Sequence, residues 1–468
     1  MKRLFSIIAV TLSLGACDSS SNNVPAPTPL PTPGNAQVQV LHAVFDAPAV
    51  DVSLSGTSNA SGGPLSGIDY KAGTGALSVQ EGGYAIQVDA LTPNGDVTVI
   101  DTSTNFVADT LYTVIAVGTT DGTLNGPGPS TPVIEPLVLS QPAAGPAAGN
   151  ARLRVVHAAP AAPEVTVYAT APGAMLSGSA PVGTFEYKGD LGPIEVPAGD
   201  YQIRVTLPAP ADPDTNVVYD AGTVALADGD DLVVAAVANT SGGAAPISLA
   251  LLTGAGSAEI LDAGTPTSFR AVHAAENVGP VDVIIDDQDA PPLVVGLTFP
   301  NFTGLVETPP ATYNVKVSPT GTGAGGAVID ADLPLDAGQR YDIIAQNNPG
   351  ITALVANDDP RPLATAAKVR LIHASPTAGT VDIWVTAPGP DLTTTAPTLV
   401  GIPVGANTGY LELAPGDYEV NIAPTTTTTA AITVQLTVAA GDILTAIAKD
   451  EVGGGAVSPT PILIDDTP

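Results

Sequence analysis

Residues 368–385, K-V-R-L-I-H-A-S-P-T-A-G-T-V-D-I-W-V, decide how this chain folds. The first six alternate between two faces of a strand, with Val369, Leu371 and His373 on one face and Lys368, Arg370 and Ile372 on the other. His373 therefore continues the apolar face, which we expect to meet the core. Pro376 marks a turn, and the apolar residues from Val381 onward predict a second strand. The two strands form either a hairpin or a corner between two sheets.

This stretch recurs at three earlier places, and each copy carries one of the four histidines of the chain: His42, His157, His273 and His373. The histidines lie 115, 116 and 100 residues apart, which is far longer than a solenoid or propeller repeat and typical of independently folding domains. We therefore divide the chain into module 1 (residues 36–140), module 2 (151–253), module 3 (267–358) and module 4 (366–466). Short linkers rich in Pro and Gly separate the modules, so we expect each module to have its own core and to reorient against its neighbours.

Two further strands recur in every module. One begins with a tyrosine, at Tyr84, Tyr201, Tyr313 and Tyr418, and alternates strictly between apolar and polar residues. The other is apolar on both faces, at residues 112–117, 232–237, 341–345 and 443–448, which predicts a central strand. About seven short strands per module, without a convincing helix, predict an all-β fold: a tandem array of four antiparallel β-sandwich (Ig-like) domains.

The N-terminal residues predict export. Lys2 and Arg3 precede an apolar run at residues 4–14 that is too short to span a membrane, and L-G-A-C follows at 14–17. This ending resembles a bacterial lipobox, which implies cleavage before Cys17 and lipid on that residue; the alternative is an ordinary signal whose cysteine is accidental. Residues 1–17 are thus a lipoprotein signal with its lipidated cysteine, and residues 18–35, rich in Pro and Ser, are a tether. We expect a protein that is lipid-anchored to the cell envelope, on the periplasmic side or at the cell surface.

The charge of the chain disfavours two classes of partner. With 14 basic and 46 acidic residues, its net charge is −32. Phosphate recognition needs clustered Lys and Arg, so we expect no nucleic acid partner and no binding to anionic lipid headgroups.

The repeated residues resemble the bacterial DUF4397 family, whose pattern is approximately V-R-x-x-H-A-S-P-x-A-x-x-V-D-V followed by a G-x-Y strand. Module 4 matches best, through Val369-Arg370, His373-Ala374-Ser375-Pro376 and Val381-Asp382-Ile383. Module 2 has Thr166 where the other modules carry Asp51, Asp282 and Asp382, and module 3 departs most, with Ala275-Glu276 in place of Ser-Pro. The resemblance covers nearly all of residues 36–466 and implies exported β-rich domains to which no activity is assigned.

The recurring histidine, with an aspartate nine residues later in three modules, is the first pair to consider for chemistry. It has the groups for proton transfer or for half of a metal site. A zinc site needs three or four ligands, however, and each module offers a single histidine and no cysteine. We interpret the recurring His, Asp and Tyr residues as structural, and we expect no enzymatic activity.

Acidic loops leave calcium open as a ligand, although no other cofactor is predicted. Asp212 and Asp214 lie in one such loop, and Asp286, Asp287 and Asp289 lie in another. Calcium requires six to eight oxygens, which alternating Asp and Asn can supply in part. Neither these loops nor the one at 357–359 completes an EF-hand, so solvated turns are the better interpretation.

Two aromatic residues on the outward face of the second strand form a different hypothesis. Trp384, the only tryptophan, and Tyr168 occupy equivalent positions, where an exposed ring would stack on a sugar. The alternative is that this face packs beneath a loop or a neighbouring domain.

Three functions remain open from the sequence. The first is a non-enzymatic, lipid-anchored spacer, adhesion or interaction array that contacts the membrane through Cys17 and has an envelope protein as its partner. The second is a polysaccharide-binding surface lipoprotein that uses Trp384 and Tyr168. The third is a calcium-stabilised adhesin.

Overall fold

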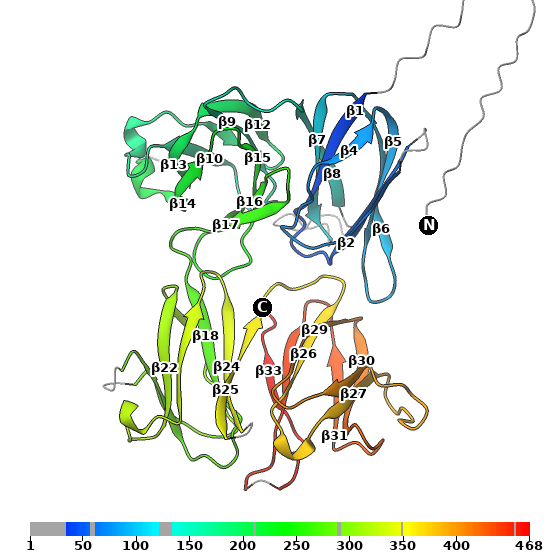
Figure 1. Ribbon diagram of the computed structural model, residues 1–468, viewed down its shortest axis with the longest axis vertical. Helices are drawn as coiled ribbons and strands as arrows, with labels where there is room; N and C mark the ends of the chain where they lie inside the picture. The colour runs from blue at the N-terminus through cyan, green and yellow to red at the C-terminus, as the bar shows by residue number, and fades with distance from the viewer. Residues whose placement is uncertain are drawn as a thin grey trace, which may run out of the picture. The chain divides into compact units, whose positions relative to one another are not determined.

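Each repeated module consists of two facing β-sheets (Figure 1). The structure, a computed structural model, describes residues 34–56, 61–120, 133–208, 212–287, 292–347, 350–453 and 455–468. The all-β prediction is confirmed: these residues form eight sheets, two per module, of four or five strands each.

In module 1 the strand orders are β4-β1-β7-β8 and β3-β2-β5-β6. The strands are β1 (Asn35–His42), β2 (Val50–Gly56), β3 (Ser61–Ile68), β4 (Leu77–Gln80), β5 (Gly82–Ala90), β6 (Val97–Phe106), β7 (Thr110–Thr119) and β8 (Val133–Pro142).

Module 2 repeats this plan with the orders β12-β9-β15-β16-β17 and β11-β10-β13-β14. Its strands are β9 (Asn150–His157), β10 (Val165–Thr170), β11 (Gly183–Phe185), β12 (Asp190–Pro197), β13 (Gly199–Thr206), β14 (Val217–Leu226), β15 (Asp231–Ala238), β16 (Ile247–Leu252) and β17 (Ser257–Ile260). It also contains two short 3₁₀ helices, η1 (Leu176–Gly178) and η2 (Pro213–Thr215). Strand β17 lies beyond residue 253, where the sequence predicted a linker. The sequence did not reveal this strand because its four residues carry no clear alternation of apolar and polar positions.

Modules 3 and 4 have the orders β21-β18-β24-β25 with β20-β19-β22-β23, and β29-β26-β32-β33 with β28-β27-β30-β31. The strands of module 3 are β18 (Thr267–His273), β19 (Val281–Ile285), β20 (Val294–Leu297), β21 (Val306–Thr308), β22 (Ala311–Pro319), β23 (Ile329–Leu335), β24 (Arg340–Asn347) and β25 (Ile351–Asp358), with η3 (Ala324–Gly326). Those of module 4 are β26 (Ala367–His373), β27 (Val381–Thr386), β28 (Leu399–Ile402), β29 (Asn407–Leu413), β30 (Gly416–Pro424), β31 (Ile432–Val438), β32 (Ile443–Ala448) and β33 (Ile462–Asp465), with η4 (Pro376–Ala378).

The first two strands of each module form a corner and not a hairpin, because they belong to opposite sheets. The strand that is apolar on both faces is central, as predicted, and it lies beside the first strand. This neighbour pair is parallel in all four modules, whereas the other described ladders are antiparallel. The first strand of each module thus pairs with a strand from late in the same module, so that the two ends of the module are held together in one sheet.

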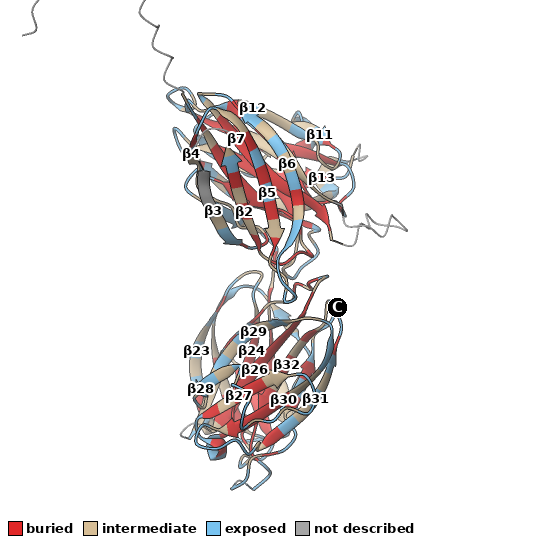
Figure 2. Cartoon of the chain, turned by 90° about the vertical axis from the view of Figure 1, so that its right-hand side faces the viewer, coloured by how far each residue is buried: buried red, intermediate tan, exposed pale blue. Residues whose placement is uncertain are grey.

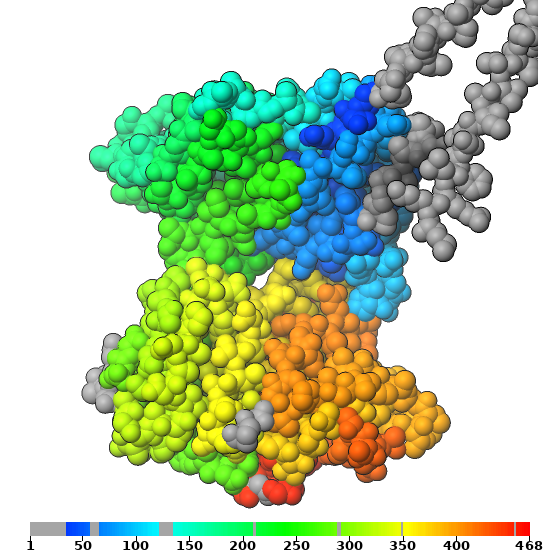
Figure 3. All heavy atoms as spheres, in the orientation of Figure 1, coloured from blue at the N-terminus to red at the C-terminus, as the bar shows by residue number. Residues whose placement is uncertain are grey.

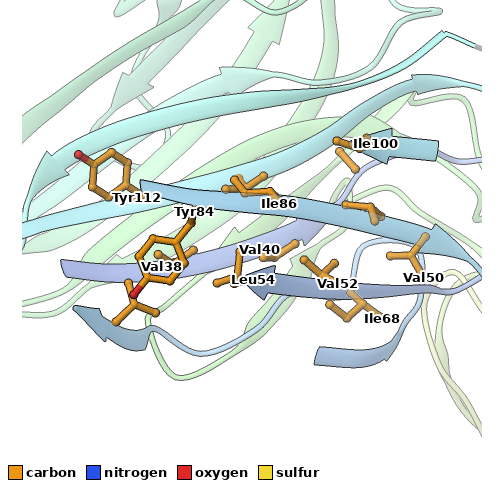
Figure 4. Close-up of a cluster of buried hydrophobic side chains, with 14 of the residues drawn as sticks. Val38, Val40, Val50, Val52, Leu54, Ile68, Tyr84, Ile86, Ile100 and Tyr112 are labelled. Carbon is orange, nitrogen blue, oxygen red and sulfur yellow. The ribbon is translucent and has the colours of Figure 1, made fainter. Parts of the chain in front are cut away.

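The core of each module lies between its two sheets. In module 1, the side chains of Val38 and Val40 on β1 face Val52 and Leu54 on β2, and Ile86 on β5 fills the space beside them (Figure 4). The inward residues alternate with outward ones, as the period of two predicts. At about 25 cal/mol per Å² of buried apolar surface, such a core stabilises a hundred-residue domain without a disulfide.

The outward faces of the central strands are buried as well. In Figure 2 the buried residues run along β7, β26 and β32, whereas β6 shows alternating exposed positions. Two clusters of buried side chains each draw on two modules: one joins modules 1 and 2, and the other joins modules 3 and 4. The sequence did not predict these contacts, which pack the outward faces of neighbouring modules against each other within the two pairs.

Candidate functional site

The four recurring histidines close the loop that crosses between the two sheets. Each Nε2 bonds the carbonyl oxygen six residues later, at 3.0 Å from His42 to Pro48 and at 2.6 Å from His373 to Gly379. A carbonyl only accepts, so Nε2 carries the proton. In modules 1, 2 and 4, Nδ1 accepts the backbone N–H two residues on. In each of these three histidines, both ring nitrogens are thus hydrogen-bonded to the backbone of the histidine's own loop.

Burial keeps these rings neutral. It lowers the pKa of His42 to about 4 and lowers the pKa of His157, His273 and His373 in the same direction, despite the opposing effect of the carbonyl bonds. The structural role of the histidines stays a prediction, and the bonds to their own loops are the contacts on which it rests.

The aspartate nine residues after the histidine holds a different turn. The carboxylates of Asp51, Asp282 and Asp382 accept the N–H of Gly67, Gly296 and Gly401 at 2.8, 2.8 and 2.7 Å. All three glycines have φ between +66° and +70°, a conformation that favours glycine, and each ladder shifts register at this point. In module 2, where Thr166 replaces the aspartate, the ladder runs without a shift. The aspartate therefore belongs to the β-bulge.

Three of the recurring tyrosines tie down the corner before their strand. The hydroxyl groups of Tyr201, Tyr313 and Tyr418 donate to the carbonyl four residues earlier, at 2.9, 2.7 and 2.9 Å. This is the tyrosine corner of immunoglobulin-like sandwiches. The hydroxyl of Tyr84 is buried and makes no hydrogen bond within the described part of the chain.

The aromatic pair predicted for sugar stacking is buried. Trp384 is 2% exposed and Tyr168 is 7% exposed. The indole Nε1 of Trp384 donates to the carbonyl oxygen of Thr395 at 2.8 Å, so the loop between β27 and β28 covers this face. The prediction of an exposed platform is wrong, and the alternative of a loop-covered face is right, because the connection is long enough to fold back over its own sheet.

The acidic loops are occupied by their own backbone and by a lysine. Asp212 caps η2 through the N–H of Asp214, while Asp214 accepts the N–H groups of Leu176 and Ser177. Asp286 accepts the N–H of Asn314 at 3.0 Å, and Asp287 pairs with Lys316.

Several predicted features lie outside the described residues or find no counterpart within them. Asp289 and Cys17 lie outside the described residues. In the part of the chain that is described, no three His, Cys, Asp or Glu side chains are grouped to hold a metal ion. Nor does any helix there have the length and apolarity to cross a bilayer.

The contact between modules 1 and 2 is apolar at its centre and reciprocal at its rim. Ile115 on β7 and Val233 on β15, both almost fully buried, belong to the shared cluster. Around it, Lys71 of module 1 pairs with Glu259 at 2.6 Å, and Lys188 of module 2 pairs with Glu135 of module 1. The two lysines occupy the same turn of their modules, with φ of 66° and 67°. The two surfaces meet in Figure 3, where module 1 is blue and module 2 is green.

The contact between modules 3 and 4 contains charges. Ile344 and Ile447 lie in its apolar cluster. Beside them Asp342 of module 3, whose side chain is 0% exposed, accepts from Arg270 of its own module and from Arg370 of module 4. Arg370, also 0% exposed, donates to the carbonyl oxygen of Asn357 at 2.7 Å.

A second acidic pair completes this buried network. Arg270 donates to Asp466 of module 4 at 2.9 Å, while Tyr410 of module 4 bonds Asp358 of module 3. Arg340 lies 3.4 Å from Asp358. The expectation of a solvated turn at 357–359 is wrong for Asp358, which is buried because three arginines surround it. Three arginines and three aspartates balance in charge, as burial of ions requires.

The arginine of the V-R pattern was not recognised as functional from the sequence. Arg154 and Arg370 are equivalent, and each donates at 2.7 Å to a carbonyl in the last strand of the preceding module, at Ser140 and Asn357. The available signal was a charged residue between apolar ones on the outward face of the first strand. A solvated side chain explains that pattern equally well, so the sequence did not separate the two.

Comparison with known proteins identifies a family to which the sequence is similar. A family model described as a domain of unknown function (DUF4397) matches residues 36–168 and 267–384, beginning in the first strand of one module and ending in the second strand of the next. No curated protein matches the chain. A solved structure, the Bacillus anthracis TIE protein, is similar over 86% of this chain and 67% of that chain at 9% identity, with a TM-score of 0.16.

Proposed function

We propose that this chain, which belongs to the DUF4397 family, is a non-enzymatic spacer and interaction array of the bacterial cell envelope, anchored by lipid on Cys17 and built from four copies of the family domain. Its four sandwiches work as two stiff pairs, 1 with 2 and 3 with 4.

The buried contacts within the pairs carry this proposal. A side chain such as Arg370 is ordered only when its partners in the other module are in place, and separation of the modules would leave its charge without Asp342. The apolar centre of the contact between modules 1 and 2 likewise favours a fixed orientation, because separation would return Ile115 and Val233 to water. Stiff pairs hold a surface at a defined distance from a membrane, which a flexible string of domains does not.

The N-terminal sequence supports the anchor. The basic residues, the short apolar run and L-G-A-C at 14–17 have the order of a lipoprotein signal, and the Pro-rich residues 18–35 supply reach. We expect the full chain to partition into the detergent phase of a membrane extract and to incorporate labelled palmitate. Cys17→Ser should abolish both. Equal partitioning of the two chains would refute the anchor.

The stiffness is tested separately with paired spin labels. Cys17 is the only cysteine, so in a Cys17→Ser background the changes Asp101→Cys and Asp200→Cys label modules 1 and 2 on exposed strand positions. We expect a single narrow distance distribution for this pair. The same pair in a chain that also carries Ile115→Asp, which places a charge in the shared cluster, should give a broad distribution. A broad distribution without Ile115→Asp contradicts the spacer.

Polysaccharide binding through Trp384 and Tyr168 receives no support from these residues, since both rings are buried.

A further inference from the structure

Module 4 is hollow between its two sheets. A cavity of about 220 Å³ lies there, lined almost entirely by aliphatic side chains such as Leu371, Ile383, Ile422, Val434 and Ala446. An apolar cavity of about 150 Å³ in another protein stays dry and takes up benzene. The space in module 4 is larger than that.

A comparison with module 3 shows where the space comes from. The same position between the sheets of module 3 holds a cavity of only about 20 Å³. At the start of the parallel ladder, module 3 pairs two aromatic residues, Phe269 and Tyr341, whereas module 4 pairs Val369 with Leu444. Module 4 therefore has two smaller side chains where module 3 has two rings.

The next inward position of the central strand differs in the same direction. Ile343 in module 3 corresponds to Ala446 in module 4, and the last inward residue of β31, Val438, corresponds to Leu335 of β23. Leu371 is larger than its counterpart Ala271, but it replaces only part of the lost volume. Since the two modules share one fold, the cavity is a property of these side chains.

The cavity reaches the surface between the edge strands β31 and β33. Leu463 pairs with Ala446 and so faces the interior side of the sandwich, yet it is 54% exposed, and it lines the cavity. Asp465 pairs with Leu444, also lines the cavity and is exposed. Hydrogen bonds from Thr467 lower the pKa of Asp465, so a carboxylate stands at the mouth at neutral pH.

We propose that module 4 binds a short, uncharged alkyl compound, with the chain inside the cavity and any hydroxyl end at Asp465. The aliphatic lining favours a hydrocarbon chain over water. The carboxylate at the mouth and the net charge of −32 disfavour an anionic head group, which separates alcohols from fatty acids.

Methyl NMR on the full chain tests this proposal with 1-hexanol as the probe and hexanoate as its anionic match. We expect saturable shifts of the isoleucine methyl groups of Ile383, Ile422 and Ile432 with 1-hexanol, and at least fivefold weaker binding of hexanoate. The methyl group of Ile86 in module 1 is the control for non-specific partitioning. Shifts of equal size at Ile86, or shifts confined to module 2, which has its own cavity of about 170 Å³, would overturn the assignment to module 4.

Ala446→Ile gives module 4 the residue that module 3 has at the same place. We expect it to fill the cavity and to weaken 1-hexanol binding at least tenfold. Ala446→Val, a smaller change, should weaken binding by an intermediate factor and serves if the larger residue disturbs the sheet. Unchanged affinity in a folded Ala446→Val or Ala446→Ile chain refutes the proposal.

Discussion

Removal of the Asp342 carboxylate should weaken the stabilisation that module 3 gives to module 4. The carboxylate of Asp342 accepts hydrogen bonds from Arg270 of its own module and from Arg370 of module 4. In Asp342→Ala, Arg270 keeps its paired bonds to Asp466, whereas among the described residues Arg370 keeps Asp358, at 3.5 Å, as its ionic neighbour. Loss of one partner of a buried ion pair costs about 3–5 kcal/mol, and we expect about 3 kcal/mol here because Arg370 retains the carbonyl of Asn357 and the hydroxyl of Thr445.

Trp384 makes this measurement specific to module 4. It is the only tryptophan and is buried, so its fluorescence reports unfolding of that module in urea. We expect the unfolding free energy of module 4 to fall by about 3 kcal/mol in Asp342→Ala. It should fall by less than about 0.5 kcal/mol in Asp332→Ala, which changes an exposed aspartate of module 3. Asp342→Asn keeps an acceptor without the charge and should lie between them. If Asp342→Ala and Asp332→Ala unfold at the same urea concentration, module 3 does not support module 4 through this network.

Three further predictions concern the recurring residues. Because burial lowers the pKa of His42 to about 4, from an unfolded value near 6.5, module 1 should lose about 3 kcal/mol as the pH falls from 6.5 to 4; amide hydrogen exchange in β1 measures the loss, which a His42→Gln chain should lack. Equal acid sensitivity of the two chains would rule out the histidine as its origin. Tyr418→Phe should destabilise module 4 by about 1 kcal/mol through the lost bond to Ala414, and an unchanged urea midpoint of Trp384 fluorescence would disprove this. Asp382→Ala should cost a similar amount, about 1 kcal/mol, with raised hydrogen exchange at Gly401, whereas normal protection of that amide would contradict the bulge assignment.

The strand pattern was predictable because it is local. The alternation at Val369, Leu371 and His373 requires no knowledge of distant residues, and the structure places all three on the inward side. The role of the histidine followed from the same alternation, since a polar ring on an inward face needs a partner within its own loop.

The outward faces were not predictable in this way. Residues of β15 alternate between two apolar environments, with Val234 in the core of module 2 and Val233 in the contact with module 1. The sequence shows that both faces are apolar but not what covers the second one. The contacts of Arg370 and Trp384 could not be predicted for the same reason. Their partners, Asp342 and the loop at Thr395, lie 28 and 11 residues away in positions that only the folded chain defines.

The apolar outward face of the central strand also sets the smallest piece of this chain that can stand alone. A single sandwich cut from the chain would expose the apolar outward face of its central strand to water, for example at Ile115 and Val117. An exposed apolar patch of this kind favours non-specific association. In a fragment that contains both sandwiches of a pair, each one covers the apolar outward face of the other. Recombination or loss within such a gene would therefore preserve a soluble product only in steps of two sandwiches, and fragments for the laboratory should be cut at the same boundaries.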